Sequence, residues 1–348
     1  MPTNRAVLFT SSEKLRQTFF SWFDESASRF SVMGLGLWPE DVFELTYTDK
    51  FNEEVIAAYS RSENCVPKTI KYQFDFHSYQ QSLTSKAFGH IAVYADIIGT
   101  TMTVFDGLTL RYPESFSVVA IARQQTKGQG RSGNKWLSPV GCAMFTLVVA
   151  IPMKSKLGQS LPILQHLTSV AVAHSVRSLP GLQEVNIGVK WPNDIYFGSE
   201  IKLGGVVVKS TMFKNNCIAS IGCGVNICNE KPTVCVNQIL KENYNKSDVL
   251  SCEQVIARTL TILEALIDDF QQNGPQGFLE MYYKYWIHSG ANVKVQRDRH
   301  SSEKLNALVI GIDECGYLRV RLDDGSITTL NPDGNSFDLT KNLIIAKS

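Results

Sequence analysis

Runs of apolar residues predict a row of β-strands in the middle of the chain. The segments are seven to eleven residues long, rich in β-branched, aromatic or continuous apolar side chains, and bounded by glycine, proline or polar residues. Six segments share this character: 89–98, 116–125, 141–151, 185–191, 202–210 and 217–226. The unbroken apolar run at 141–151 is typical of a strand buried on both faces. The region is therefore predicted to hold one large sheet.

Two segments with a period near 3.6 residues predict helices between and after these strands. In residues 160–179, Ser160 is the candidate N-cap, Pro162 suits the first turn, and Pro180 follows the end. Ser251 and Gln254 form a capping-box pattern that opens a second, amphipathic helix. Its apolar stripe is spaced by three and four residues: Ile256, Leu260, Leu263, Ile267 and Phe270. The aromatic segment FLEMYYKYW predicts a third, short helix.

The pattern changes towards both ends of the chain. Residues 1–85 have weak periodicity, and the stretch SVMGLGLWPEDVFEL has the glycine and proline spacing of a loop. From residue 289 onwards, short strands alternate with hairpin turns at 314–316 and 323–325. We predict an N-terminal extension over 1–85, partly ordered and packed on the rest. An α/β body over 86–288 and a small all-β barrel over 289–348 are expected to follow.

Composition narrows the class of protein. The 348 residues are 44% hydrophobic with a net charge of +1, without the basic excess of a nucleic-acid-binding protein. No apolar run is long enough to span a membrane, and no secretory signal is recognisable. Eight cysteines without a C-x-x-C pair favour reduced thiols, and the cluster Cys217, Cys223, Cys228 and Cys235 lacks zinc-finger spacing. A cytoplasmic location is expected, with a weakly amphipathic N-terminus leaving a mitochondrial location open.

The segment RQQTKGQGRSGNKW, residues 123–136, is the first candidate for chemistry. Glycines let backbone N–H groups approach an anion, and nearby cations balance its charge. The glycines and cations concerned are Gly128, Gly130, Gly133, Lys127, Arg131 and Lys135. The segment matches neither a P-loop nor a dinucleotide-binding glycine motif. Taken alone, it fits an anion-binding loop and an ordinary flexible basic loop equally well.

Three shorter motifs follow in order. In KWPND, Asn193 and Asp194 stand at a predicted strand end, where their oxygens could hold Mg²⁺ or form an Asn-Asp turn. In KLGG, Lys202 could place its charge on a carboxylate or phosphate, or be a solvated strand-edge lysine. GCGVN, ending at Asn226, could contribute to a site or form a turn between strands. No Ser-His-Asp or Cys-His arrangement offers a covalent nucleophile.

The order and spacing of QTKGQGRSGNKW, KWPNDIY, KLGGVVV and GCGVN resemble those of the biotin–protein ligase family. WLSPVGCA and the tail NPDGNSFDLTKNLI extend the resemblance, which covers about residues 88–348 and looks most like the eukaryotic holocarboxylase synthetase branch. It implies an α/β (α+β) fold: a class II synthetase-like, lipoate-ligase-like mixed sheet followed by an SH3-like β-barrel. It implies ATP and biotin as substrates, Mg²⁺ as cofactor and biotinyl-5′-AMP as intermediate. The implied partners are biotin carboxyl carrier domains of acetyl-CoA-, pyruvate- and propionyl-CoA-type carboxylases.

The resemblance also implies roles for single positions. Biotin contacts are implied for Thr100, Thr101, Gln125, Gly128, Gly130, Arg131, Lys202 and Gly205. Nucleotide or adenylate contacts are implied for Arg131, Trp136, Asn193, Asp194, Lys202 and Asn226. The catalytic candidates are Lys202, Arg131 and Asp194. Asp194 is also the candidate Mg²⁺ ligand and a candidate base for the acceptor lysine.

Two positions depart from the family pattern. Gln129 stands where many members carry Arg or Lys, so one loop cation is missing. Either Lys127 or Lys135 is expected to compensate, or the intermediate is held less tightly. Met102 stands where bacterial members have Asn. The alternatives are a lipoate or octanoate ligase of the same fold and a catalytically impaired biotin-binding protein; binding to DNA is not expected, because residues 1–85 show no helix-turn-helix pattern.

Overall fold

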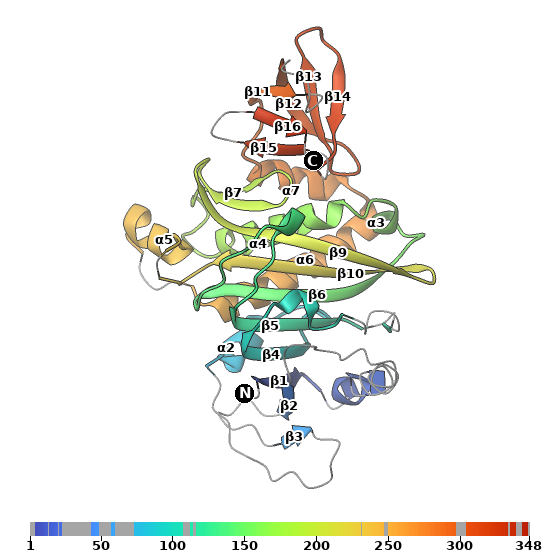
Figure 1. The fold of residues 1–348 in the computed structure, drawn as a ribbon, viewed down its shortest axis with the longest axis vertical. Helices are drawn as coiled ribbons and strands as arrows, with labels where there is room; N and C mark the ends of the chain where they lie inside the picture. Colours follow the sequence, from blue (N-terminus) through green and yellow to red (C-terminus); the bar gives the residue numbers. More distant parts are fainter. Residues whose placement is uncertain are drawn as a thin grey trace.

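The computed structural model of the protein contains two sheets (Figure 1). A ten-stranded mixed sheet forms the centre, and a six-stranded sheet stands at one end. The structure describes residues 4–12, 14–19, 21–22, 43–48, 57–59, 73–106, 112–113, 116–230, 232–246, 250–296, 304–332, 335–338 and 343–346.

The large sheet combines the predicted central strands with three from the N-terminus. Its strands are β1 (Asn4–Thr10), β2 (Phe43–Thr48), β3 (Ala57–Tyr59), β4 (Ile91–Ile98), β5 (Val118–Gln125), β6 (Cys142–Pro152), β7 (Ile187–Lys190), β8 (Asp194–Phe197), β9 (Ile201–Phe213) and β10 (Asn216–Asn226). They lie in the order β3-β2-β1-β4-β5-β6-β10-β9-β8-β7. The β1–β2 and β4–β5 pairs are parallel, and the other pairs are antiparallel. The mixed-sheet α/β prediction is thus confirmed.

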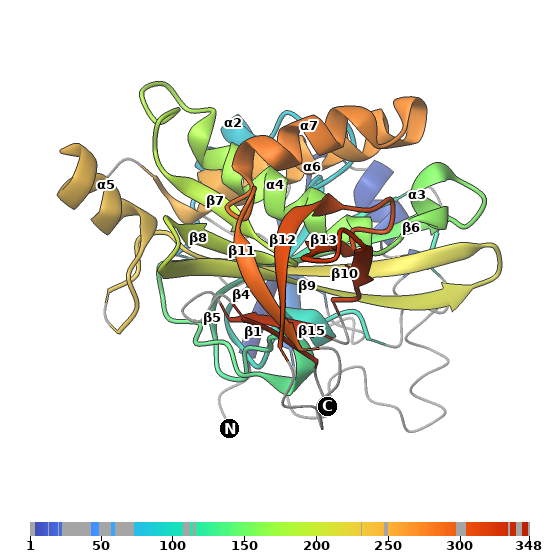
Figure 2. The ribbon, with the colours of Figure 1, turned by 90° about the horizontal axis from the view of Figure 1, so that it is seen from above.

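Helices cover one face of this sheet, as Figure 2 shows for α2, α4, α6 and α7. The helices are α2 (Phe76–Ser82), α3 (Lys156–Gln159), α4 (Ile163–Arg177), α5 (Val236–Tyr244), α6 (Cys252–Asn273) and α7 (Gln276–Tyr285). Helix α4 is buried on nearly all sides, polar residues such as His166 and Thr168 included, because it packs between the sheet and α6 and α7. The predicted capping box opens α6, with Ser251 Oγ accepting a hydrogen bond from the Gln254 N–H at 3.2 Å.

The opposite face of the sheet holds a second apolar cluster and leaves room for a site. N-terminal residues such as Leu8 and Trp22 pack there against side chains from β4, β5 and β10, including Ile218. Alternate residues of a strand share a face, so Gly222 and Gly224 of β10 lie on the same side as Ile218. Ligand access is therefore expected on this face, away from the helices.

The C-terminal sheet packs against the end of the large sheet. Its strands are β11 (Asn292–Gln296), β12 (Leu305–Ile312), β13 (Leu318–Leu322), β14 (Ile327–Leu330), β15 (Asn335–Asp338) and β16 (Leu343–Ala346), in the order β14-β13-β12-β11-β16-β15. Gly316, in the first predicted hairpin turn, has a φ of +77°, and a Cβ there would lie 2.4 Å from His166 Nε2. Glycine is required at this turn because it touches α4 directly.

Several element boundaries and short elements differ from the sequence predictions. Helix α4 begins at Ile163 with Pro162 at its N-cap, whereas Ser160 ends α3 and does not cap α4. Residues 191–193 form a turn, so the turn considered at Asn193 and Asp194 is present at Asn193, while Asp194 begins β8. Strand β8 was not predicted, and neither were α5, β15 and β16. The predicted loop SVMGLGLWPEDVFEL ends inside β2, and its residues 31–42 lie outside the described ranges. Among the described helices, none has the length and apolar character needed to cross a bilayer.

Candidate functional site

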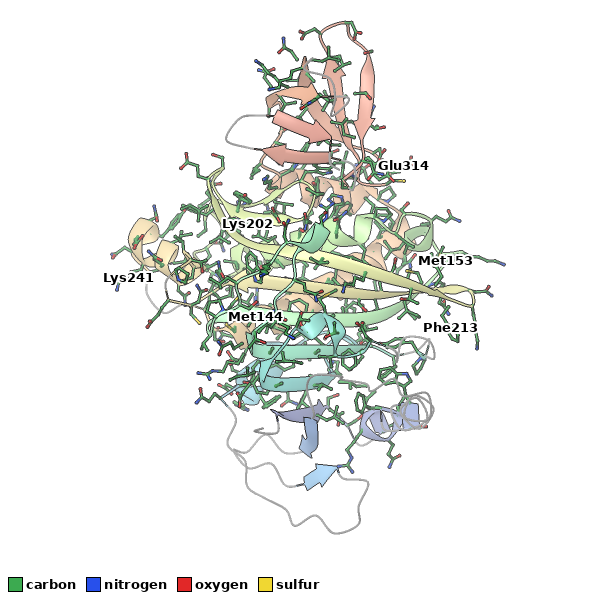
Figure 3. All side chains as sticks on the ribbon, viewed as in Figure 1. Met144, Met153, Lys202, Phe213, Lys241 and Glu314 are labelled. Carbon is green, nitrogen blue, oxygen red and sulfur yellow. The ribbon has the colours of Figure 1, made fainter. Side chains whose placement is uncertain are left out.

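A cavity of about 190 Å³ lies on the face of the large sheet opposite α4 and α6, beside the C-terminal sheet. Figure 3 shows Lys202, one of its lining residues, near the middle of the molecule below the C-terminal sheet. The cavity brings together most of the residues selected from the sequence: Thr100, Thr101, Gln125, Gly130, Arg131, Trp136, Asn193, Asp194, Lys202 and Gly205. Gly128 and Asn226 are outside this lining. Segments separated by up to about a hundred residues thus meet at one place, as the motif order implied.

One end of the cavity is a network of neutral hydrogen-bonding groups. The Gln125 Oε1 atom accepts from the Thr101 N–H at 2.7 Å and from the Thr101 hydroxyl at 3.1 Å. The Gln125 amide donates to Ser138 Oγ at 3.0 Å, and the Thr146 hydroxyl donates to Thr101 Oγ1 at 2.8 Å. Buried polar groups that fix one another in this way present a defined pattern of donors and acceptors. Sequence analysis missed Thr146, although a polar residue inside an apolar strand was a signal.

The other end of the cavity is charged. Lys202 Nζ lies 2.8 Å from Asp194 Oδ1 and 5.7 Å from the centre of the Trp136 ring. The antiparallel register of β8 and β9 sets Asp194 opposite Gly205, where a Cβ would come within 3.0 Å of the carboxylate. Glycine at this position keeps the space in front of the pair open. Lys202 is therefore an ion-paired cation in the cavity lining, and its side chain is also exposed to solvent.

The segment KWPND connects this site to the C-terminal sheet. Trp191 is fully buried and precedes a cis peptide bond to Pro192. The Trp191 indole N–H donates to the Gly316 carbonyl at 2.9 Å, and its backbone N–H donates to His288 Nε2 at 3.1 Å. Burial, with the nearby Lys190 charge, lowers the pKa of His288 to about 3, so the ring stays neutral and can accept this hydrogen bond. The two contacts fix the segment that carries Asn193 and Asp194.

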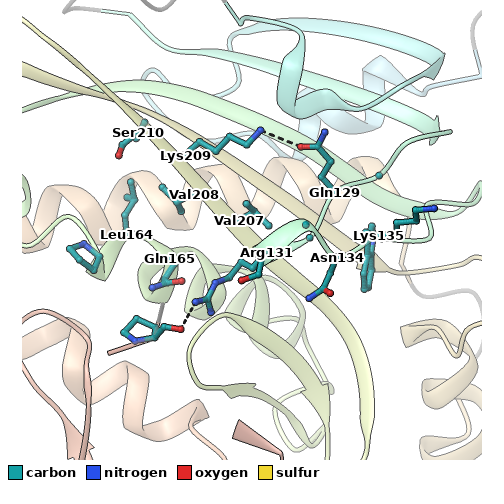
Figure 4. Close-up of a pocket in the computed structure, with 18 of the residues that line it drawn as sticks. Gln129, Arg131, Asn134, Lys135, Leu164, Gln165, Val207, Val208, Lys209 and Ser210 are labelled. Carbon is teal, nitrogen blue, oxygen red and sulfur yellow. Dashed lines mark hydrogen bonds between the residues drawn. The ribbon is translucent and has the colours of Figure 1, made fainter. Parts of the chain in front are cut away.

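The glycine loop covers the cavity, and its arginine joins the two sheets. Arg131, labelled in Figure 4, donates to Asn193 Oδ1 at 3.0 Å and to the Pro332 carbonyl at 2.7 Å. Inside the loop, the Trp136 N–H donates to the Gly128 carbonyl at 2.9 Å. A Cβ on Gly128 would lie 2.3 Å from the Trp136 carbonyl oxygen, so this position tolerates only glycine. Gly128 therefore packs inside the glycine loop against the Trp136 backbone and does not line this cavity.

The GCGVN motif is part of β10 and not a turn. A Cβ on Gly222 would lie 2.1 Å from Met102 Sδ, and one on Gly224 would lie 2.6 Å from Trp136 Nε1. The two glycines thus let Met102 and the Trp136 indole lie directly on the sheet. Asn226 ends the strand and is 1% exposed, two residues beyond Gly224.

A larger cavity, about 1100 Å³, lies on the outer side of the glycine loop. Its lining carries four cations and no carboxylate: Lys127, Arg131, Lys135 and Lys209. Lys209 of β9 donates from Nζ to Gln129 Oε1 at 3.2 Å (Figure 4). Gln129 thus meets two cations, Lys209 through its side chain and Lys135 through a backbone bridge. Lys135 is one of the two lysines expected to compensate, whereas sequence analysis did not select Lys209, which is distant in sequence.

The residues expected to hold Mg²⁺ are already engaged by cations. Asp194 pairs with the Lys202 ammonium group, and the Asn193 side-chain oxygen accepts from Arg131. Mg²⁺ prefers oxygen ligands and usually keeps substrate phosphates and waters around it. Within the described ranges, no three His, Cys, Asp or Glu side chains gather as a metal site. Asn193 and Asp194 as arranged therefore do not fit a pre-formed magnesium site.

The fold and site define an α/β ligand-binding domain of the biotin and lipoate ligase class. Residues 94–226 match the family model described as biotin/lipoate A/B protein ligase family, and residues 288–339 match that of the biotin protein ligase C-terminal domain. The biotin protein ligase of Aquifex aeolicus in complex with biotin and ATP superposes with a TM-score of 0.52 at 22% identity, covering 70% of this chain and 96% of that one. Because the sequence identity is only 22%, the superposition establishes the fold alone.

Two relatives identify the family. The human biotin–protein ligase is 38% identical over 98% of this chain, which spans 46% of the human protein. Biotin–protein ligase 2 of Arabidopsis thaliana is 31% identical over 79% of this chain and 82% of its own length. The chain belongs to the biotin–protein ligase family, and the similarity to the human protein agrees with the eukaryotic branch expected from WLSPVGCA. The chain spans about half the length of the human relative.

Proposed function

We propose that the chain is an ATP-dependent, AMP-forming biotin–protein ligase. One observation carries the proposal: a single cavity joins the neutral network around Thr101 and Gln125 to the charged group of Lys202, Asp194 and Arg131. The neutral end suits a polar ring system, and the charged end suits a carboxylate next to a phosphate. An acyl adenylate has both features in one molecule.

In the first step, a biotin carboxylate oxygen attacks the α-phosphorus of ATP, forming an O–P bond and releasing pyrophosphate. We assign the biotin ring to Thr100, Thr101 and Gln125, which the hydrogen-bond network holds in place. The Lys202 ammonium group offsets the negative charge of carboxylate and phosphate as they approach. Trp136 is assigned to the adenine ring, because its indole lies against Gly224 of β10 in the cavity lining and an aromatic ring can stack on adenine. No covalent bond to the enzyme is required.

In the second step, an acceptor lysine amine attacks the carbonyl carbon, the C–O bond to phosphate breaks, and AMP leaves. Asp194 is the candidate to take the amine proton, since its carboxylate lines the same cavity. The glycine loop is assigned to excluding water, which would otherwise hydrolyse the mixed anhydride. Mg²⁺ is proposed to enter with the ATP phosphates, because the nearest carboxylate is already paired with Lys202.

The proposed acceptors are biotin carboxyl carrier domains of acetyl-CoA-, pyruvate- and propionyl-CoA-type carboxylases. The division into residues 1–85, 86–288 and 289–348 also remains a proposal, as does a cytoplasmic or mitochondrial location. The proposal that biotin carboxyl carrier domains are the acceptors is supported by the matches to the C-terminal domain model and to the human ligase.

Transfer of labelled biotin tests the proposal. Purified protein is mixed with Mg²⁺-ATP, biotin and an apo biotin-carrier domain, and a parallel reaction contains lipoate and its carrier. ATP-dependent label on one carrier lysine in the biotin reaction is expected. Label only in the lipoate reaction would establish the lipoate or octanoate ligase instead. Label in neither reaction, with biotin still bound, would establish the catalytically impaired binding protein.

Lys209 gives a second prediction for the same site. Replacing Lys209 by methionine removes the cation that contacts Gln129, so we expect faster release of the adenylate from under the glycine loop. The contact is exposed, and such contacts contribute about 0.2–1 kcal/mol, which corresponds to a change of up to about fivefold. Release of labelled biotinyl-5′-AMP by rapid filtration measures it.

The matched variants separate charge from other effects. Gln129→Lys in the Lys209→Met background returns a cation to the loop and is expected to restore slow release. Lys241→Met, on α5, removes an exposed lysine outside both cavity linings and is expected to leave release unchanged. Equal release rates in Lys209→Met and the unsubstituted protein would show that Gln129 needs no compensation.

A further inference from the structure

The N-terminal residues form part of the large sheet, next to the strand that leads into the site. Strand β1 pairs antiparallel with β4, from Ala6 opposite Ala95 to Thr10 opposite Ile91. The chain then turns back, and residues 14–19 and 21–22 are helical. Neither family-model match includes this segment, because the first begins at residue 94. Its position therefore raises the question of what it contributes to the site.

Trp22 lies at the centre of an aromatic cluster on the face of the sheet opposite α4 and α6. The indole is 4% exposed, and its ring centre lies 5.1 Å from Phe116, 5.4 Å from Tyr112 and 6.2 Å from Phe105. The contacts to Phe116 and Tyr112 are edge-to-face, a favourable geometry for aromatic pairs. The Tyr112 hydroxyl donates to the Val148 carbonyl at 2.6 Å, which anchors the cluster on β6.

The cluster reaches the site through the short 3-10 helix η1 (Thr101–Thr103). Thr100 is the N-cap of η1, and its hydroxyl accepts from the Met102 N–H at 3.3 Å. Two residues after η1, Phe105 is 4% exposed and packs against Trp22. One side of this tight turn therefore lines the cavity through Thr100 and Thr101, while the residues that close the turn belong to the Trp22 cluster.

We propose that Trp22 is a positioning residue for the biotin end of the site, acting through Phe105 and η1. The proposal rests on the proposed function for the identity of the ligand. A turn of three residues has few internal hydrogen bonds, so its position depends on what it packs against. Gln125 holds η1 from the cavity side, and Trp22 holds the following residues from the opposite side. The N-terminal segment thereby acts within its own chain on ligand binding.

Loss of the indole is expected to affect the two ends of the cavity differently. Removing a large buried side chain leaves space into which its neighbours relax only in part, and Phe105 is one of those neighbours. A shift of Phe105 displaces Thr100 and Thr101 relative to the biotin ring. The nucleotide end depends on Trp136, Asp194 and Lys202, which belong to the glycine loop, β8 and β9. Biotin affinity is therefore expected to fall while nucleotide affinity is retained.

The experiment compares binding by the full chain of biotin and of a non-hydrolysable ATP analogue, by calorimetry, so no turnover is needed. Trp22→Ala is expected to weaken biotin binding about tenfold and to change nucleotide binding less than about twofold. Trp22→Phe retains a ring against Phe105 and Tyr112 and is expected to recover most of the biotin affinity. If Trp22→Ala fails to fold, Trp22→Phe provides the test instead. It is then expected to show a smaller loss of affinity for biotin and no loss for the nucleotide.

Phe270→Ala is the matched control. Phe270 is 2% exposed and packs against Phe278 at a ring-centre distance of 6.2 Å on the helix-covered face, away from the cavity. The Phe270→Ala variant also loses a buried aromatic ring, and its biotin affinity is expected to equal that of the unsubstituted protein. Equal biotin affinity in the Trp22 variants and the unsubstituted protein would overturn the inference, as would parallel losses for biotin and nucleotide. Absence of biotin binding by the unsubstituted protein would instead overturn the proposed function.

Discussion

Replacing Lys202 by alanine is expected to abolish formation of biotinyl-5′-AMP while leaving the fold intact. Lys202 Nζ lies 2.8 Å from Asp194 at the charged end of the cavity. The side chain is 41% exposed, so the substitution removes little packing. It does remove the positive charge nearest the point where carboxylate and phosphate must meet. Loss of one such electrostatic contact typically lowers rates by about 10²–10³-fold.

Adenylate formation in the Lys202 variant is best followed as ATP–pyrophosphate exchange dependent on biotin. Thermal unfolding of the same protein reports whether the fold is retained. Lys241→Ala, an exposed lysine on α5, is the control for loss of a surface charge. Exchange at the unsubstituted rate in Lys202→Ala would remove Lys202 from the mechanism.

The second large effect is expected from Arg131→Gly, which should release the adenylate early and cause indiscriminate labelling of lysines. Arg131 holds the glycine loop against both sheets, through Asn193 Oδ1 at 3.0 Å and the Pro332 carbonyl at 2.7 Å. Hydrogen bonds made by a charged donor contribute about 1.5–3 kcal/mol each. Losing both is expected to speed release of the adenylate by at least about tenfold, because a loop without these anchors opens more often.

Mass spectrometry of a bystander protein added to the reaction measures this loss of specificity. Many biotinylated lysines on the bystander are expected with Arg131→Gly, and almost none with the unsubstituted protein. Arg321→Gly on β13 removes an exposed arginine outside both site cavities and serves as the control. Retention of the adenylate at the unsubstituted level would show that other residues keep the loop closed.

Local patterns predicted the elements well where one physical signal dominated. The capping box at Ser251 and the apolar run at 141–151 lead to α6 and β6 because capping and burial act within a few residues. Strand β8 was missed, since KWPND contains a proline and turn-forming residues, and its pairing with β9 decides its conformation. The N-terminal strands were missed because weak periodicity conceals strands that are completed by pairing with β4.

In the candidate site, some residues were predicted from the sequence and others were found only in the structure. Residues within motifs, such as Lys202 and Arg131, were selected because their order matches a family pattern. Their partners were not selected, because Lys209 is distant in sequence and belongs to no motif, and the tail motif that contains Pro332 had no contact assigned to it. Thr146 is intermediate, since its polar group inside an apolar strand was visible but had no assigned partner. Sequence therefore supplied the candidate reactive groups, and the fold supplied the contacts that hold them in place.

Isolation of the enzyme-bound intermediate tests the central claim most directly. The protein is incubated with biotin and Mg²⁺-ATP without any acceptor, passed through a desalting column and denatured, and the released small molecules are identified by mass spectrometry. The account predicts biotinyl-5′-AMP at close to one molecule per protein chain, and no lipoyl adenylate in a matched incubation with lipoate. Recovery of unreacted biotin alone, or of the lipoyl adenylate in its place, would contradict it.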